Sequence, residues 1–208
     1  MFSWGIFFFD RFFVKLKSLF IKRILIYRGV SVGDNFLIYG IPYLKLNGKT
    51  KNIIIGNNVE IYGNIDIRNR EYGKIIISDN VKFDTDCRLV AANNAILTIG
   101  ECVAIGPRCI FNCGANVTIG KKSLFSGGIF VNSSAHEISR NTFIRDQGYY
   151  HKPVVIGEDV FIGANAVISP GVHLKNGSVI GANAVASRDC MEYSINVGIP
   201  AKIIKTRE

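Results

Sequence analysis

The chain has 208 residues, with 25 Lys and Arg against 16 Asp and Glu, a formal net charge of +9, and 48% hydrophobic residues. This length can bury one good core, and the 21 Gly are scattered along the chain, which argues against a linker or a second globular domain. The five Cys are odd in number and include no CxxC pair. We therefore expect free thiols rather than a disulfide scaffold, and a reducing, cytoplasmic setting.

Residues 1–28 differ in composition from the rest of the chain. They hold seven Phe, the only Trp, and six basic residues against one acid, which is +5 of the total charge of +9. The longest uncharged run, residues 1–9, is too short to span a bilayer, and no basic region precedes it as a secretory signal requires. On a helical wheel one stripe is apolar: Ile6, Phe9, Phe13, Leu16 and Phe20.

The basic side chains Arg11, Lys15 and Lys22 lie away from that stripe. An aromatic stripe with basic flanks is typical of a helix that lies in a membrane interface near anionic headgroups. The alternative is a helix that packs on the end of the following domain or on another subunit, and the two are compatible. No recognised nucleic-acid motif accompanies the positive charge, so we expect no nucleic-acid partner.

From residue 32 onward an apolar residue returns every six positions, in groups of three separated by short insertions. A period of six is neither helical nor that of a single strand. It suits a coil that turns a corner every six residues and stacks on the previous coil. Three hexads form one three-sided coil, so the chain predicts about seven coils whose strands pair in parallel along the axis. The anchors are Val32, Ile38, Leu44; Ile55, Ile61, Ile67; Ile77, Phe83, Leu89; Ile99, Ile105, Phe111; Ile119, Phe125, Val131; Ile156, Ile162, Ile168; and Leu174, Ile180, Ala186.

The regular repeat stops after Val131, and a polar run that ends at His136 begins the break. A neutral imidazole beside an irregular loop can take a proton from a hydroxyl near pH 7. His151 lies 15 residues after His136, and His173 lies 22 residues after His151. Zinc hydratases with six-residue repeats need two His about five residues apart, so we expect no metal site.

Three segments resemble the hexapeptide-repeat acyltransferases, and the resemblance covers roughly residues 32–205. They are Lys152–Asn165, in which Phe161 stands where many members carry Trp, the run Pro170-Gly171-Val172, and the ending Gly198-Ile199-Pro200-Ala201-Lys202. The resemblance implies an all-β fold, a left-handed parallel β-helix, which we expect over residues 29–208 after the amphipathic helix that the wheel indicates for residues 1–28. It further implies a substrate loop at 137–153, acetyl-CoA as co-substrate, and a homotrimer with active sites between subunits.

Within this family the chain is most similar to sugar and polysaccharide O-acetyltransferases, whose loop His acts as general base. His136 matches that position. Ser134 stands where Asp is common, and Glu137 follows the imidazole as a group to orient it. No serine nucleophile is needed, so Ser133 and Ser134 are interpreted as turn residues. The resemblance assigns the remaining site residues as follows: Gly163, Ala164, Gly181 and Ala182 to the pantetheine arm, Lys202 and Lys205 to the phosphates of CoA, and Asn112, Asn132 and Arg145 to the acceptor.

The sequence therefore predicts O-acetylation of a sugar hydroxyl on a cell-surface polysaccharide or its precursor, at the inner face of the cell membrane. Two alternatives stay open. The first is acetylation of the amino group of a nucleotide-linked sugar or of a soluble small acceptor. The second is a solenoid scaffold without catalytic activity.

Overall fold

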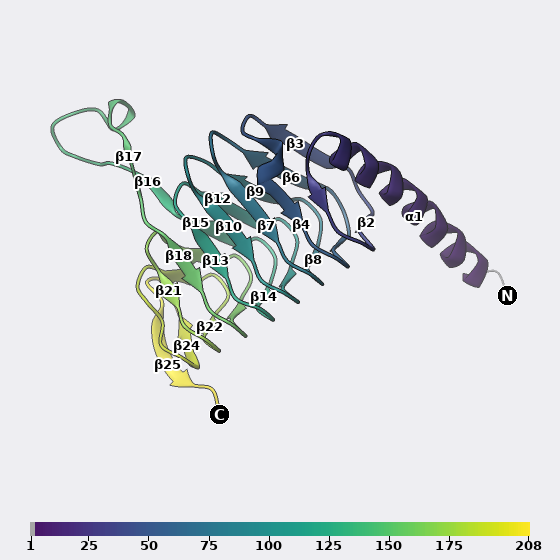
Figure 1. Cartoon of the computed structure of the whole chain (residues 1–208). Coiled ribbons are helices and arrows are strands. Elements are labelled where there is room, and N and C mark those ends of the chain that lie inside the picture. Colours follow the sequence, from purple (N-terminus) through teal and green to yellow (C-terminus); the bar gives the residue numbers. More distant parts are fainter. Residues whose placement is uncertain (1–2) are drawn as a thin grey trace.

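The computed structural model describes the backbone of residues 3–208 and the side chains of residues 11–208. The chain forms a left-handed parallel β-helix of about seven three-sided coils, with the helix α1 (Ser3–Tyr27) at its N-terminal end (Figure 1). The fold predicted from the six-residue period is confirmed. Met1 and Phe2, and the side chains of Ile6 and Phe9, lie outside the described part.

Each side of the prism is one sheet, and each coil adds one strand to every sheet. The first sheet, sheet A, contains β1 (Ser31–Val32), β4 (Ile53–Ile55), β7 (Lys74–Ile77), β10 (Ile96–Ile99), β13 (Val117–Ile119), β18 (Val154–Ile156) and β21 (His173–Leu174). Sheet B contains β2 (Leu37–Ile38), β5 (Glu60–Ile61), β8 (Lys82–Phe83), β11 (Ala104–Ile105), β14 (Leu124–Phe125), β19 (Phe161–Ile162), β22 (Val179–Ile180), β24 (Ser194–Val197) and β25 (Lys202–Thr206). Sheet C contains β3 (Pro42–Leu46), β6 (Ile65–Asn69), β9 (Cys87–Ala91), β12 (Ile110–Cys113), β15 (Phe130–Asn132), β20 (Val167–Ile168) and β23 (Val185–Ala186).

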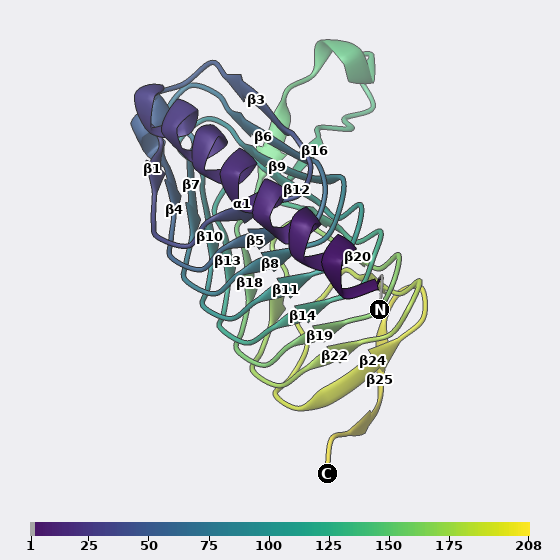
Figure 2. The same cartoon turned by 90° about the vertical axis from the view of Figure 1, so that its right-hand side faces the viewer.

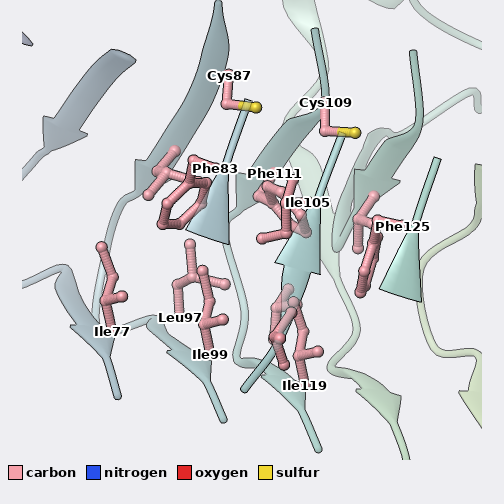
Figure 3. Close-up of a cluster of buried hydrophobic side chains, with 14 of the residues drawn as sticks. Ile77, Phe83, Cys87, Leu97, Ile99, Ile105, Cys109, Phe111, Ile119 and Phe125 are labelled. Atoms are coloured by element: carbon pink, nitrogen blue, oxygen red, sulfur yellow. The ribbon is translucent and has the colours of Figure 1, made fainter. Parts of the chain in front are cut away.

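The repeating apolar anchors fill the interior of the prism in columns. Anchors of successive coils pair in register, as Ile105 does with Phe83 before it and Phe125 after it, and all three are buried. Figure 3 shows these columns of Ile, Leu and Phe side chains pointing inward from neighbouring coils. All the predicted anchors are buried except Val32 and Leu44 of the first coil, which are partly buried against the same core.

The corners between the sheets require a left-handed backbone conformation. At the corner between sheets A and B, one residue of each coil has a positive φ: Asn35, Asn58, Asn80, Cys102, Lys122, Asp159 and Gly177. After the first coil their amides donate to the previous corner, as Asn58 N does to Asp34 O at 2.7 Å. Asn tolerates this conformation better than most residues, and the Asn58 side chain also donates to Asn80 Oδ1 at 3.1 Å. The corners therefore explain why Asn and Gly recur between the hexads.

All five cysteines are free thiols. Cys87, Cys109, Cys113 and Cys190 are buried in the prism, as small apolar side chains are, whereas Cys102 is exposed at a corner. Burial raises the pKa of the Cys190 thiol to about 11, so this thiol is protonated at neutral pH. The buried thiols thus serve packing, as expected from the sequence.

The helix α1 lies across the open N-terminal end of the prism (Figure 2). Leu25 is buried in the core cluster, and the Ser18 hydroxyl accepts a hydrogen bond of 2.9 Å from the amide of Ile38 on β2. One face of the helix therefore covers the first coil. No helix in the described part of the chain is both long enough and apolar enough to cross a membrane.

An ion-pair network links two coils on the outer face of sheet C. The Asp66 carboxylate accepts hydrogen bonds from Arg68 on its own strand at 2.7 Å and from Arg88 on the next coil at 2.9 Å. Partial burial disfavours the charged carboxylate, but the hydrogen bonds and charges of both arginines outweigh it and lower the pKa of Asp66 below its ordinary value. The network ties β6 to β9.

Replacing Asp66 with Asn is expected to reduce the free energy of unfolding by about 1–2 kcal/mol at neutral pH, because the charge-assisted hydrogen bonds from two arginines are weakened. The folded-state pKa lies below the unfolded one, so this stabilisation is present above pH about 4 and is lost as the pH falls through the lowered folded value. Urea denaturation of both proteins at neutral and acidic pH measures the difference. Asp146→Asn, in the exposed loop, is the control. A difference that stays constant down to acidic pH would contradict this account.

Candidate functional site

The regular coils are interrupted once, between β15 and β18, by a hairpin that leaves the prism. Its strands are β16 (Ser134–His136) and β17 (Tyr149–His151), which pair antiparallel, with His136 opposite Tyr149 and Ser134 opposite His151. The hairpin projects from the side of the solenoid (Figure 1). The hairpin starts at Ser134, three residues before the loop expected at 137–153, and the coil resumes at β18.

His136 stands at the outer end of this hairpin with its side chain exposed. Its ring lies against that of Tyr149, with a centroid separation of 4.2 Å and a tilt of 38°. This cross-strand contact restricts the orientation of the imidazole while leaving its edge open to solvent. A ring held in this way can accept a proton from a group that approaches from outside.

His151 lies at the inner end of the same hairpin, in a polar cluster. Its Nδ1 is 2.8 Å from the Ser134 hydroxyl. Its Nε2 is 3.4 Å from the side-chain amide of Asn93, at the corner that follows β9. The Tyr149 ring is nearly parallel to the His151 ring, at 6.3 Å between centroids. His151 is not predicted as a site residue from the sequence, and its position in the break of the repeat is the signal that could have marked it.

The two serines before His136 have different environments. Ser133 is buried, and its hydroxyl accepts hydrogen bonds from the amides of Gly114 and Ala115 at 3.1 and 3.0 Å. Ser134 faces His151. Ser133 therefore fixes the point at which the chain leaves the coil, in agreement with its interpretation as a turn residue.

Asn112 and Asn132 occupy equivalent places on β12 and β15. The Asn112 amide donates to Asn132 Oδ1 at 3.0 Å, and the same oxygen accepts from the amide of Ser134 at 3.1 Å. The two side chains form a short ladder that leads from sheet C to the start of the hairpin. Both are partly exposed, so they can offer polar groups to a ligand beside the hairpin.

The loop between β16 and β17 contains the 3-10 helix η2 (Ile144–Asp146) and is held together by Gln147. The Gln147 side chain accepts from the amide of Ser139 at 2.6 Å and donates to the carbonyls of Ser139 and Thr142, both at 2.8 Å. Arg145, on η2, is exposed. The Glu137 amide donates to Gly148 O at 3.0 Å, but no contact between its carboxylate and His136 is recorded among the described residues, so its orienting role stays a prediction.

The residues expected to hold the pantetheine arm lie at another corner of the prism. Gly163 follows β19 and Gly181 follows β22, so both occupy the corner at which sheet C begins, whereas His136 lies beyond the point at which it ends. One side of the prism lies between these two corners. At about 3.3 Å per residue in a strand, it spans on the order of 20 Å. A Cβ on Gly163 would stand 2.5 Å from the amide of Ala182, so the turns of these two coils are closely stacked. One chain alone does not bring Gly163, Ala164, Gly181 and Ala182 to His136.

Lys202 and Lys205 are exposed on the last strand, β25, which folds back antiparallel on β24 after the cis peptide bond between Ile199 and Pro200. Arg207 fastens the end of this strand, because its guanidinium donates to Asp159 Oδ2 at 2.9 Å and to Gly177 O at 3.0 Å. The two lysines thus extend sheet B next to the coil that contains Gly181.

A separate groove of about 300 Å3 lies on the early coils, where sheet B turns into sheet C. It is lined by Tyr43, Asn64, Ile65, Asp66, Asp86, Cys87, Arg88, Arg108 and Ile110. It contains the Asp66 network and lies at the opposite edge of sheet C from the hairpin. Within residues 3–208 no group of three or more His, Cys, Asp or Glu is placed to hold a metal ion.

Comparisons with known proteins agree with this fold. Residues 153–187 match the family model described as the hexapeptide repeat of succinyl-transferase. A probable acetyltransferase of Mycobacterium tuberculosis is 29% identical over 75% of this chain and 50% of its own length. A dTDP-4-amino-4,6-dideoxy-D-glucose acyltransferase of Escherichia coli is 28% identical over 68% of this chain and 87% of its own. A putative lipopolysaccharide biosynthesis O-acetyltransferase of Escherichia coli is 28% identical over 65% and 74%.

The chain thus spans half the length of the first of these relatives and most of the other two. Among solved structures, a polysialic acid O-acetyltransferase has the same fold, with a TM-score of 0.58, 20% identity, and coverage of 84% of this chain and 88% of that one. A hexapeptide-repeat acetyltransferase of Vibrio cholerae, solved with acetyl coenzyme A, is 31% identical over 53% of this chain and 60% of its own, with a TM-score of 0.50.

Replacing Gly114 with Ala is expected to disturb the inner end of the hairpin without unfolding the prism. The added methyl group would stand 2.0 Å from Ser134 Oγ and 2.4 Å from His151 Nδ1, so the hydrogen bond between these groups must break. NMR spectra of the imidazole nitrogens should show a changed His151 signal, while His173, on sheet A, keeps its own. An unchanged His151 signal in a folded variant would show that the contact does not exist in solution.

Proposed function

We propose that this chain, which belongs to the hexapeptide-repeat acetyltransferases, transfers the acetyl group of acetyl-CoA to a sugar hydroxyl. The observation that carries the proposal is the exposed imidazole of His136, which the hairpin holds against Tyr149 outside an otherwise regular prism. A general base needs a restricted orientation and access to the acceptor. The contact with Tyr149 restricts the imidazole on one side, and its other side is exposed.

The reaction needs no covalent intermediate on the protein. His136 takes the proton of the acceptor hydroxyl while that oxygen attacks the thioester carbonyl, and the C–S bond then breaks to release CoA, whose sulfur regains a proton. General-base assistance of this kind contributes about 10²–10⁴ in rate, and the alignment of both substrates in one cleft supplies much of the remainder. The Asn112–Asn132 ladder beside the hairpin offers polar groups to the acceptor.

Acetyl-CoA as the donor is supported by the relative from Vibrio cholerae that was solved with it. The stacked turns at Gly163 and Gly181 present small residues at the surface, and such turns let a thin chain run close to the backbone. Lys202 and Lys205 lie on β25, which β24 separates from β22 in the same sheet, and their ammonium groups can meet phosphates there.

The proposal includes a homotrimer, as the family resemblance implies, and the geometry of one chain supports a contribution from a neighbouring copy. In one chain the turns at Gly163 and Gly181 lie at the opposite edge of sheet C from His136. A neighbouring copy can supply those turns to the hairpin of the first, which places each site between two subunits. The exposed Arg145 and Tyr150 of the hairpin and its loop then face the acceptor.

The acceptor class we favour is a cell-surface polysaccharide or its precursor, because one relative is named as an O-acetyltransferase of lipopolysaccharide biosynthesis. The relative named as an acyltransferase of dTDP-4-amino-4,6-dideoxy-D-glucose supports transfer to a nucleotide-linked amino sugar as the second candidate. Mild base cleaves O-acetyl esters and leaves N-acetyl amides intact, so treatment of the labelled product distinguishes the two.

His136→Ala is expected to lower kcat by about 10²–10⁴ and to leave the KM for acetyl-CoA nearly unchanged, because the base acts in the chemical step. Release of free CoA thiol in the presence of candidate glycans measures the rate. His173→Ala, on the regular face of sheet A, is the matched control and should keep its activity. Full activity of the His136 variant would refute the proposed base, and a lack of CoA binding by calorimetry would favour a scaffold.

Replacing Lys202 and Lys205 together with Ala is expected to raise the KM for acetyl-CoA by about tenfold with a much smaller effect on kcat, because lost phosphate contacts weaken binding uniformly. Lys82→Ala, on an early strand of the same sheet, serves as the control. The same thiol assay over a range of acetyl-CoA concentrations gives both constants. An unchanged KM would remove these two lysines from the donor site.

A further inference from the structure

The helix α1 has two apolar faces, and only one of them is covered. The covered face carries Val14, Ser18, Ile21 and Leu25, which are spaced three or four residues apart and are partly or fully buried. This face contacts β1 and β2 of the first coil. One side of the helix alone is therefore sufficient to cover the open end of the parallel stack.

The opposite face of α1 is apolar and exposed. Phe12, Leu16, Leu19 and Phe20 recur at three- and four-residue spacing and form a stripe, and Tyr27, seven residues after Phe20, extends it on the same side of the helix. Phe20 is 66% exposed and Tyr27 92% exposed. These large side chains point away from the prism, and nothing in the described part of the chain covers the stripe.

Cationic side chains border and interrupt the stripe. Arg11 and Lys15 are exposed beside it, and Arg23 lies within it. Among the described residues none of these three takes part in an ion pair, whereas Lys22, nearer the prism, pairs with Asp34 at 3.2 Å. The aliphatic stem of Arg23 can lie among the apolar groups while its guanidinium reaches a more polar layer.

We propose that the outward face of α1 binds the surface of an anionic lipid bilayer, with the helix parallel to the membrane plane. The aromatic and aliphatic side chains of the stripe enter the boundary between headgroups and acyl chains, and Arg11, Lys15 and Arg23 meet the lipid phosphates. The covered face keeps the prism attached to the helix, so binding requires no unfolding of the first coil. The inference is independent of the proposed acetyl transfer.

Charge complementarity favours a lipid surface over a second copy of the same helix. Pairing two such stripes would bring the arginine and lysine side chains of both copies together, with no acidic residue among the described residues 11–28 to compensate for them. Anionic headgroups supply the opposite charge along the entire helix.

Sedimentation of the full chain with vesicles tests this proposal. The wild-type protein should bind vesicles that contain phosphatidylglycerol and should bind vesicles of phosphatidylcholine alone much more weakly. The variant Phe12→Ser/Leu16→Ser/Phe20→Ser should lose at least about tenfold in affinity, because three apolar side chains that would enter the bilayer are removed. The variant Arg11→Gln/Lys15→Gln/Arg23→Gln should lose a similar factor for anionic vesicles and should show a weaker dependence on salt.

Phe143→Ser, at an equally exposed aromatic residue of the distant loop, is the matched control and should bind as wild type does. Unchanged thermal unfolding of each variant establishes that the prism is intact, since none of the substituted side chains is buried. Equal vesicle binding by wild type and the stripe variant would overturn the proposal. The proposal would also be overturned if the stripe variant formed smaller oligomers than the wild type and the wild type did not bind vesicles. The stripe would then be a contact between copies.

Discussion

Backbone hydrogen bonds in this solenoid run from each coil to the next, so every coil depends on its neighbours for its polar groups. Gly120 N donates to Ile156 O, and Gly157 N donates in turn to Leu174 O. This dependence demands identical turns in every coil, which is why corner residues such as Cys102 and Lys122 adopt a left-handed conformation that their side chains disfavour. The hairpin of β16 and β17 can leave the stack only because β13 pairs directly with β18 and closes the gap it leaves.

The same constraint decides where chemistry can be placed. Side chains that point inward are committed to the core. Functional groups must therefore come from outward-facing strand positions, from the corners and from the interruption of the coils. His136 comes from an interruption, Gly163 and Gly181 from a corner, and the parallel strands of sheet C keep the two apart within one chain. In the proposed assembly, packing of separate prisms brings them together.

The repeat could be read from the sequence because each anchor reports directly on burial: Ile55, Phe111 and Leu174 all point into the prism as predicted. Contacts within the hairpin could not be predicted in this way. The pairing of Tyr149 with His136 and of Ser134 with His151 depends on the register of two strands separated by an irregular loop, and no periodic pattern encodes that register. For the helix, only one face could be predicted from the sequence. A helical wheel shows the stripe of Leu16 and Phe20, but it does not show that Ser18 and Leu25 form the face that packs on the prism.

The rigid stack also works as a spacer with a set length. The helix covers the first coil, and the hairpin leaves the prism at β15, four strand positions beyond β3 in sheet C. At about 4.8 Å per strand the imidazole of His136 lies on the order of 20 Å from the helix along the axis. If α1 rests on a bilayer as proposed, the enzyme reaches only those sugar rings of a lipid-attached glycan that extend this far from the membrane. The number of coils, rather than any side chain, would then select which part of the glycan is modified.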